Sequence, residues 1–134
     1  MDQPRRCRQC RDAVPKGRRT FCGPQCVHEF KIRHWQSYAA QHVRRRDCEV
    51  CSLCGMDCRK LYRILRRTRR ARQTLMRMGL KTSWPRRLWE ADHIIPRAEG
   101  GGLLGLENLR TLCLWCHRAQ TAQLMSRLKT RQAS

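Results

Sequence analysis

Acidic residues, aromatic residues and long hydrophobic runs are all scarce in this chain. Its 134 residues include only 10 Asp and Glu, and aromatic residues make up 6%. The longest stretch without Asp, Glu, Lys or Arg is residues 34–43, far shorter than the ~18 apolar residues of a membrane-spanning helix. The N-terminus carries no apolar signal region. We therefore expect an intracellular protein without a membrane segment, located in the cytoplasm or nucleoid of a prokaryote or in the nucleus of a eukaryote.

Positive charge and cysteine are present in excess. The chain has 30 Lys and Arg, a formal net charge of +20 and 10 cysteines. A chain of this length and composition is expected to have a small apolar core, so its cysteines are expected to serve as cross-links or metal ligands. In a reducing compartment, closely spaced cysteines favour thiolate ligands over disulfides. The charge predicts a polyanionic partner.

The first four cysteines form an N-terminal group. Cys7 and Cys10 are separated by two residues, Cys22 and Cys26 by three, and Pro15 and Gly17 indicate a turn between the pairs. Such pairs present their sulfurs to one tetrahedral ion at about 2.3 Å, so the sequence predicts a structural zinc site. The alternative is four free thiols on a poorly folded arm.

The other six cysteines leave more than one interpretation open. The spacing of Cys48, Cys51, Cys54 and Cys58 is that of a bacterial iron–sulfur cluster, although arginine stands where proline is expected next. The segment from Cys113 to His117 also matches the attachment pattern of c-type haem, which requires an exported protein.

The hydrophobic periodicity predicts a mixed α and β chain. Residues 27–46 have apolar side chains at helical spacing, so we expect one helix there, with His34 and His42 on its face rather than as ligands. One further helix is expected before Gly79 and another over residues 118–129. Residues 88–95 and 109–113 are expected to be strands, joined by a loop rich in glycine. Trp84, Trp89 and Trp115 are interpreted as packing residues.

These elements suggest two blocks with a basic segment inserted in the second. We assign residues 1–46 to an N-terminal zinc knuckle and helix, and residues 47–134 to the second block. Residues 59–87 contain 12 basic side chains and no acidic one. A solvated helix or a mobile insert would have this composition, but the excess of charge favours contact with phosphates.

Four residues in the second block have the properties that phosphodiester hydrolysis requires. The reaction needs a base that deprotonates water and a cation that holds the phosphate. A histidine such as His93 can act as the base, while a carboxylate and a second histidine, Asp92 and His117, can hold a divalent cation. Neighbouring strand residues point to opposite sides, so Asp92 and His93 fit one site only at an irregular strand end. Asn108 can bond the loop backbone and orient His93.

Three segments resemble the HNH, or ββα-metal, endonuclease family in its zinc-stabilised form: WEADHIIPRAEGGG, LENLRTLC and CH. In order along the chain, Asp92-His93, Asn108 and His117 are framed by two cysteine pairs. FCGPQCVHEF and the arginine-rich stretch are further similar to the HNH module of zinc-finger, Ran-binding annealing helicases. The resemblance implies an α+β fold: a small zinc-stabilised ββα-metal unit preceded by a zinc knuckle and a helix.

The resemblance also implies roles for individual residues. His93 would be the general base, Asn108 would orient it, and Asp92 and His117 would hold a catalytic Mg²⁺ or Mn²⁺. A structural zinc site would be formed by Cys51, Cys54, Cys113 and Cys116, in addition to the site of Cys7, Cys10, Cys22 and Cys26. Cys48 and Cys58 would then be buried thiols or alternative ligands.

The resemblance implies a DNA endonuclease that leaves 5′-phosphate and 3′-hydroxyl ends on double-stranded or branched DNA. We expect low sequence specificity or recognition of DNA structure, because phosphate contacts carry little sequence information. The arginines expected to contact DNA are Arg63, Arg66, Arg67, Arg70, Arg97, Arg110 and Arg118. A non-catalytic zinc-ribbon module that binds nucleic acid is the main alternative, and an iron–sulfur protein is a further one.

Overall fold

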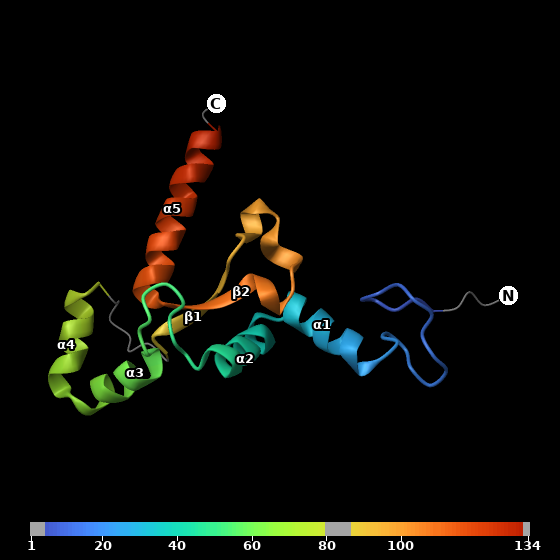
Figure 1. Cartoon of the computed structure of the whole chain (residues 1–134), viewed down its shortest axis with the longest axis horizontal. Helices are drawn as coiled ribbons and strands as arrows, with labels where there is room; N and C mark the ends of the chain where they lie inside the picture. Colours follow the sequence, from blue (N-terminus) through green and yellow to red (C-terminus); the bar gives the residue numbers. More distant parts are fainter. Residues whose placement is uncertain (1–4, 80–86, 133–134) are drawn as a thin grey trace.

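The computed structural model describes residues 5–79 and 87–132 of the chain. Two antiparallel strands lie at its centre, and the helices extend from them (Figure 1). In chain order the helices and strands are α1 (Pro24–His34), α2 (Gln36–Asp47), α3 (Cys58–Arg67), α4 (Arg69–Arg77), β1 (Trp89–His93), β2 (Leu109–Cys113) and α5 (Leu114–Gln132). Three short 3₁₀ turns, η1 (Arg97–Glu99), η2 (Gly101–Leu103) and η3 (Leu106–Asn108), lie in the loop between the strands.

The two strands form a hairpin whose register places Asp92 opposite Arg110 and His93 opposite Leu109. β2 has the predicted bounds, whereas β1 is shorter than predicted and ends at His93. With α5 following β2, the chain has the predicted α+β arrangement of two strands and a helix. The long loop leaves the sheet directly after His93.

The single helix predicted over residues 27–46 is wrong, because the structure has two helices that meet at Trp35. The backbone of Trp35 is extended (φ −118°, ψ 99°). Its N–H still donates to the carbonyl of Lys31 and its carbonyl accepts from Ala39, so the residue closes α1 and opens α2. The bend lets α2 pack against the strands while α1 runs toward the N-terminal cysteines (Figure 1).

The basic segment also contains two helices where one was predicted. α3 and α4 are separated by Thr68, whose backbone is extended (φ −113°, ψ 118°). The side chain of Asp57 accepts a hydrogen bond from the N–H of Lys60 at 2.8 Å and so caps the start of α3. The predicted helix break at residues 83–85, including Trp84, lies outside the described residues.

The last helix begins four residues earlier than predicted. α5 starts at Leu114, directly after β2, and the N–H of Leu114 donates to the carbonyl of Leu88 beside the start of β1. Cys116 and His117 therefore lie in the first turn of α5, where the sheet fixes their position.

The core is small and lies between α2 and the hairpin. Val43, Leu88 and Leu112 are fully buried, and the sulfur-bearing residues Cys51 and Cys113 belong to the same cluster. The expected packing roles of two tryptophans are confirmed, since Trp89 is buried and Trp115 packs against this cluster. Among the described helices, none combines the length and the apolar character that crossing a bilayer requires.

The end of α2 is tied to β2 by charged side chains. The carboxylate of Asp47 accepts a hydrogen bond from the N–H of Thr111 at 3.0 Å, and Arg46 donates to the carbonyls of Leu106 and Leu109. The guanidinium of Arg46 lowers the pKa of Asp47, so this carboxylate stays ionised. The predicted boundary between residues 46 and 47 falls within α2, and the division into two blocks remains a prediction.

Candidate active site

Two groups of four cysteines bring their sulfur atoms together. In each group all four sulfurs lie within 4.8 Å of one another, and no other cluster of three or more candidate ligands occurs in the part of the chain that the structure describes. A tetrahedral ion with sulfur ligands at about 2.3 Å separates those sulfurs by about 3.8 Å. Both groups therefore have the donor type and the spacing that zinc requires.

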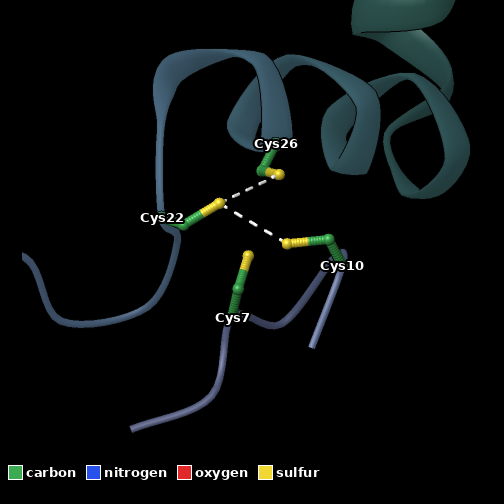
Figure 2. A group of neighbouring side chains, drawn as sticks. All are labelled: Cys7, Cys10, Cys22 and Cys26. Carbon is green, nitrogen blue, oxygen red and sulfur yellow. Dashed lines mark hydrogen bonds between the residues drawn. The ribbon is translucent and has the colours of Figure 1, made fainter. Parts of the chain in front are cut away.

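The first group consists of Cys7, Cys10, Cys22 and Cys26, whose side chains converge from a loop and the first turn of α1 (Figure 2). The sulfur of Cys22 lies 3.5 Å from that of Cys10 and 3.3 Å from that of Cys26. This is the set of ligands that the N-terminal spacing predicted, and it joins the N-terminal arm to α1.

The second group joins segments that are far apart in the sequence. Cys51 and Cys54 lie in the turn before α3, whereas Cys113 and Cys116 lie at the junction of β2 and α5. The sulfurs of Cys54 and Cys113 are 3.8 Å apart. Ser52 adds two hydrogen bonds to the carbonyl of Thr111, so protein contacts support the same junction.

The turn that carries Cys7 and Cys10 and the turn that carries Cys51 and Cys54 share one backbone geometry. In each turn the N–H of the residue after the second cysteine donates to the carbonyl of the first cysteine at 2.9 Å. That residue, Arg11 in the first turn and Gly55 in the second, has a left-handed backbone, with φ of 70° and 72°. This turn aims both sulfurs of a pair in one direction, which is why a two-residue spacing serves as a ligand pair.

The acidities of the thiols differ within the first group. Burial raises the pKa of Cys7, but hydrogen bonds from three nearby backbone N–H groups outweigh it and lower that pKa to about 6. The backbone N–H of Asp12 lowers the pKa of Cys10, yet burial and the neighbouring thiols raise it to about 11. Four sulfurs this close cannot all ionise without a cation between them, which is the electrostatic condition of a thiolate metal site.

Cys48 and Cys58 belong to neither group. Cys48 is exposed, whereas Cys58 is fully buried, and burial raises the pKa of its thiol to about 12. The iron–sulfur alternative requires one cluster of four sulfurs, from Cys48, Cys51, Cys54 and Cys58. Among the described residues these four are not gathered together, so the arrangement disfavours that alternative. Cys58 is therefore one of the predicted buried thiols, whereas the prediction is wrong for Cys48, which is neither buried nor within a ligand group.

Asp92 and His117 face each other at the end of the hairpin. The Oδ1 atom of Asp92 lies 3.8 Å from Nε2 of His117, while Oδ2 accepts a hydrogen bond from Nε of Arg110 at 3.1 Å. Arg110 therefore fixes the carboxylate and leaves one oxygen directed at the imidazole. A divalent cation bound at about 2.1 Å from each of the two atoms fits this gap.

His93 is the last residue of β1, where the strand geometry ends. Asp92 and His93 line the same cavities, so the predicted requirement for an irregular strand end is met. Burial and the nearby guanidinium of Arg97 lower the pKa of His93 and outweigh the opposite effect of Asp92. The imidazole is therefore neutral near pH 7, the form that can accept a proton.

Asn108 holds the loop that follows His93. Its buried side-chain amide donates to the carbonyls of Ile95 and Gly101 at 3.1 and 3.0 Å, and it accepts from the N–H of Ile95 at 2.9 Å. Gly101 must be glycine because a Cβ there would lie 1.7 Å from the carbonyl oxygen of Ile95. The loop is thus closed on itself beside His93.

Two adjoining cavities meet at these residues. One, of about 330 Å³, extends along α5 and η1, and the other, of about 260 Å³, extends toward the α1–α2 corner. Asp92, His93, Arg97 and His117 line both. The four predicted site residues are therefore arranged together, three around the cavities and Asn108 in the supporting loop.

The arginines predicted to contact DNA are distributed over separate places. Arg97 and Arg110 line the first cavity. Arg118 donates to the carbonyl of Gly79 at 2.9 Å and so links α5 to the chain just after α4. The exposed arginines of α3 and α4 line neither cavity; these are Arg63, Arg66, Arg67 and Arg70.

Several cavity residues were not predicted. On α5, Gln120, Thr121 and Arg127 line the first cavity, and their helical spacing from His117 was a usable signal. Arg33 and His34 line the second cavity at the end of α1. No pattern in the sequence placed these two residues there, because the bend at Trp35 was not predicted.

Known proteins show similarity across most of this chain. The sequence model described as HNH endonuclease matches residues 79–123. The chain is 35% identical over 120 residues to "DNA annealing helicase and endonuclease ZRANB3" of Mus musculus, covering 77% of this chain and 11% of the relative. The Homo sapiens protein of that name is 32% identical over 132 residues, covering 85% and 12%. The chain thus spans about a tenth of the length of these curated relatives.

A solved structure is similar over nearly its whole length. The crystal structure of the human ZRANB3 HNH domain is 31% identical to this chain, with a TM-score of 0.53. The match covers 72% of this chain and 95% of that domain.

Proposed function

This chain belongs to the HNH endonuclease family, and we propose that it is a metal-dependent DNA endonuclease that hydrolyses phosphodiester bonds. The observation that carries the proposal is the position of Asp92, His93 and His117 around one cavity, with Oδ1 of Asp92 3.8 Å from Nε2 of His117. The zinc sites are then structural and the cavity is catalytic.

His93 is the proposed general base. Its neutral imidazole accepts a proton from a water molecule, and the resulting hydroxide attacks phosphorus in line with the bond to the leaving 3′ oxygen. Asn108 keeps the loop beside His93 closed through three hydrogen bonds, so the imidazole is presented to the cavity in one orientation. The products are a 5′-phosphate and a 3′-hydroxyl end.

Asp92 and His117 are the proposed ligands of a catalytic Mg²⁺ or Mn²⁺. Such a cation would neutralise charge on the phosphate and on the leaving oxygen. Two protein ligands leave most of the coordination shell for water and phosphate oxygens, as is usual for Mg²⁺. Arg110 supports this role because its hydrogen bond holds the carboxylate of Asp92 in place.

The substrate is proposed to be double-stranded or branched DNA. Exposed arginines on α3 and α4, together with Arg97 and Arg118, would contact the sugar–phosphate backbone. Contacts of this kind position a duplex without reading its bases, so the enzyme is expected to have low sequence specificity or to recognise DNA structure.

A plasmid assay tests the function. Supercoiled plasmid should remain intact in EDTA and should be nicked or linearised when Mg²⁺ or Mn²⁺ is added in excess. The nicks should be sealed by DNA ligase, because that enzyme requires a 5′-phosphate beside a 3′-hydroxyl. A zinc-loaded protein that binds DNA but never cleaves it with either metal would instead establish the alternative, a non-catalytic nucleic-acid-binding module.

A further inference from the structure

The end of α1 forms a wall of the catalytic cavity. Arg33 and His34 line the second cavity together with Asp92, His93 and Arg97. These two residues lie outside residues 79–123, the range that the HNH sequence model matches. The bend at Trp35 places them there, because it turns the chain just after His34.

The imidazole of His34 is exposed but held in a defined position. It stacks on the ring of Phe30, one helical turn earlier, with the ring centroids 4.2 Å apart and the planes inclined by 29°. The neighbouring Arg33 donates from Nε to the carbonyl of Leu103 at 3.0 Å, which attaches the end of α1 to η2. His34 is therefore fixed with respect to the loop that follows His93.

Phe30 is in turn held by the N-terminal cysteine block. The ring of Phe21, the residue before Cys22, lies 5.2 Å from the ring of Phe30. The guanidinium of Arg8, between Cys7 and Cys10, lies 5.0 Å from the Phe30 centroid. The cysteine group at the start of α1 (Figure 2) is thus connected through Phe30 to His34 at the end of the same helix.

The second cavity has the charge that an anion requires. Two guanidinium groups line it, from Arg33 and Arg97, and one carboxylate, that of Asp92. Asp92 is paired with Arg110 and Arg33 with Glu29, at 3.4 Å, so the positive charge of Arg97 remains in the lining. An imidazole N–H can donate a hydrogen bond to a phosphate oxygen whether the ring is neutral or cationic. His34 and His93 line the same cavity, so a DNA strand that presents its scissile phosphate to His93 can present the next phosphate to His34.

We propose that His34 binds the DNA phosphate adjacent to the scissile one, and that the N-terminal four-cysteine site positions His34 through Phe30. The inference rests on the proposed nuclease function for the location of the scissile phosphate. It makes the N-terminal block a part of the substrate site, in addition to its role in folding.

Binding of DNA tests the contact without requiring catalysis. Fluorescence anisotropy of a labelled duplex, measured with Ca²⁺ in place of Mg²⁺ or Mn²⁺, should show roughly tenfold weaker binding for His34→Ala, the lower end of the range for one hydrogen bond to a charged group. The variant replaces an exposed side chain, and its melting temperature and zinc content should equal those of the wild type. Ser37→Ala alters an exposed side chain of α2 that lines neither cavity and should bind as the wild type does. Wild-type affinity in His34→Ala would overturn the proposal.

Two substrates separate the adjacent phosphate from the scissile one. Bis(p-nitrophenyl) phosphate has a scissile phosphodiester but no neighbouring phosphate. His34→Ala should lower kcat/KM for DNA by the same factor as the binding loss and leave hydrolysis of the small ester unchanged. Equal losses on both substrates would place His34 at the reacting phosphate and overturn the assignment. A wild type that cleaves neither substrate would refute the nuclease function, while the binding experiment would still decide the role of His34.

The double variant tests whether Phe30 positions His34, because the losses of DNA affinity from the two substitutions should then not add. Phe30→Leu should weaken DNA binding less than His34→Ala does, and the double variant should bind no more weakly than His34→Ala alone. Phe30→Tyr keeps the stacked ring and should bind as the wild type does. Independent, additive losses from Phe30→Leu and His34→Ala would show that Phe30 does not act through His34.

Discussion

Asn108 and Ile95 exchange two hydrogen bonds across the loop between the strands. Oδ1 of Asn108 accepts from the N–H of Ile95 at 2.9 Å, and Nδ2 donates to the carbonyl of Ile95 at 3.1 Å. Ile95 lies two residues after the proposed base, His93. The pair therefore holds the chain where it leaves the strand, and we propose that it positions the imidazole of His93 in this way.

Asn108→Ala is expected to reduce both stability and cleavage. The substitution removes two hydrogen bonds to the partly buried backbone of Ile95 and one to the buried carbonyl of Gly101, which costs about 2–4 kcal/mol of the free energy of unfolding. Urea unfolding measures the loss, and plasmid nicking should fall by at least about tenfold because the loop no longer holds His93. Gln123→Ala, which removes an exposed amide of α5, should change neither quantity. Full activity in Asn108→Ala would contradict the positioning role.

His93→Ala is expected to abolish catalysis selectively. Loss of the base should lower the cleavage rate by about 10² or more, while DNA affinity and melting temperature stay close to those of the wild type. Initial rates of plasmid nicking and anisotropy titrations measure the two properties. Ser37→Ala, which changes an exposed side chain outside both cavities, serves as the control. Nicking by His93→Ala at the wild-type rate would show that another group deprotonates water.

Cys113→Ser is expected to release one zinc ion and unfold the hairpin with α5. Cys113 shares its group with Cys51 and Cys54 from a distant segment, so its loss separates parts of the chain that the small core cannot hold together. Cys58→Ser provides a matched control, because Cys58 is equally buried but lies outside both groups; it should retain both ions. Thermal melts and zinc content compare the two variants. An unchanged melting curve for Cys113→Ser would contradict the structural role.

Metal analysis of the purified protein is expected to give two zinc ions and no iron per chain. Each four-cysteine group supplies one tetrahedral set of thiolates. Mass spectrometry under non-denaturing conditions and elemental analysis measure the count. A brown protein that contains iron would support the cluster interpretation of Cys48, Cys51, Cys54 and Cys58 instead.

DNA affinity is expected to fall steeply with salt concentration. Each phosphate that the protein neutralises releases condensed cations, so replacing the arginines that bind DNA by glutamine should reduce the slope of log affinity against log salt. The reduction should be about 0.9 for each phosphate that is no longer neutralised. The residues to replace are Arg63, Arg66, Arg67 and Arg70. Titrations at several KCl concentrations with two unrelated duplex sequences measure the slope. A slope unchanged by all four substitutions would show that α3 and α4 face solvent rather than DNA.

Elements with a local signal could be predicted from the sequence. Two cysteines separated by two residues form a ligand pair because one short turn aims both sulfurs together, as the turns at Cys7 and Cys51 show. β2 was predicted at its actual bounds, because its apolar residues are confined by the loop before it and the cysteine pair after it. The α+β class followed from the order of such segments along the chain.

Tertiary structure alone decided where the functional atoms meet. The bend at Trp35 and the early start of α5 accompany packing of α2 and α5 against the sheet, whereas the bend at Thr68 brings α4 against α3. No local periodicity encodes such contacts between elements. The 3.8 Å approach of Asp92 to His117 requires the hairpin, and the place of His34 in the cavity requires the bend that ends α1. Spacing along the chain limits which side chains can be neighbours within a turn, but only contacts between distant segments bring two imidazoles and a carboxylate to one cavity.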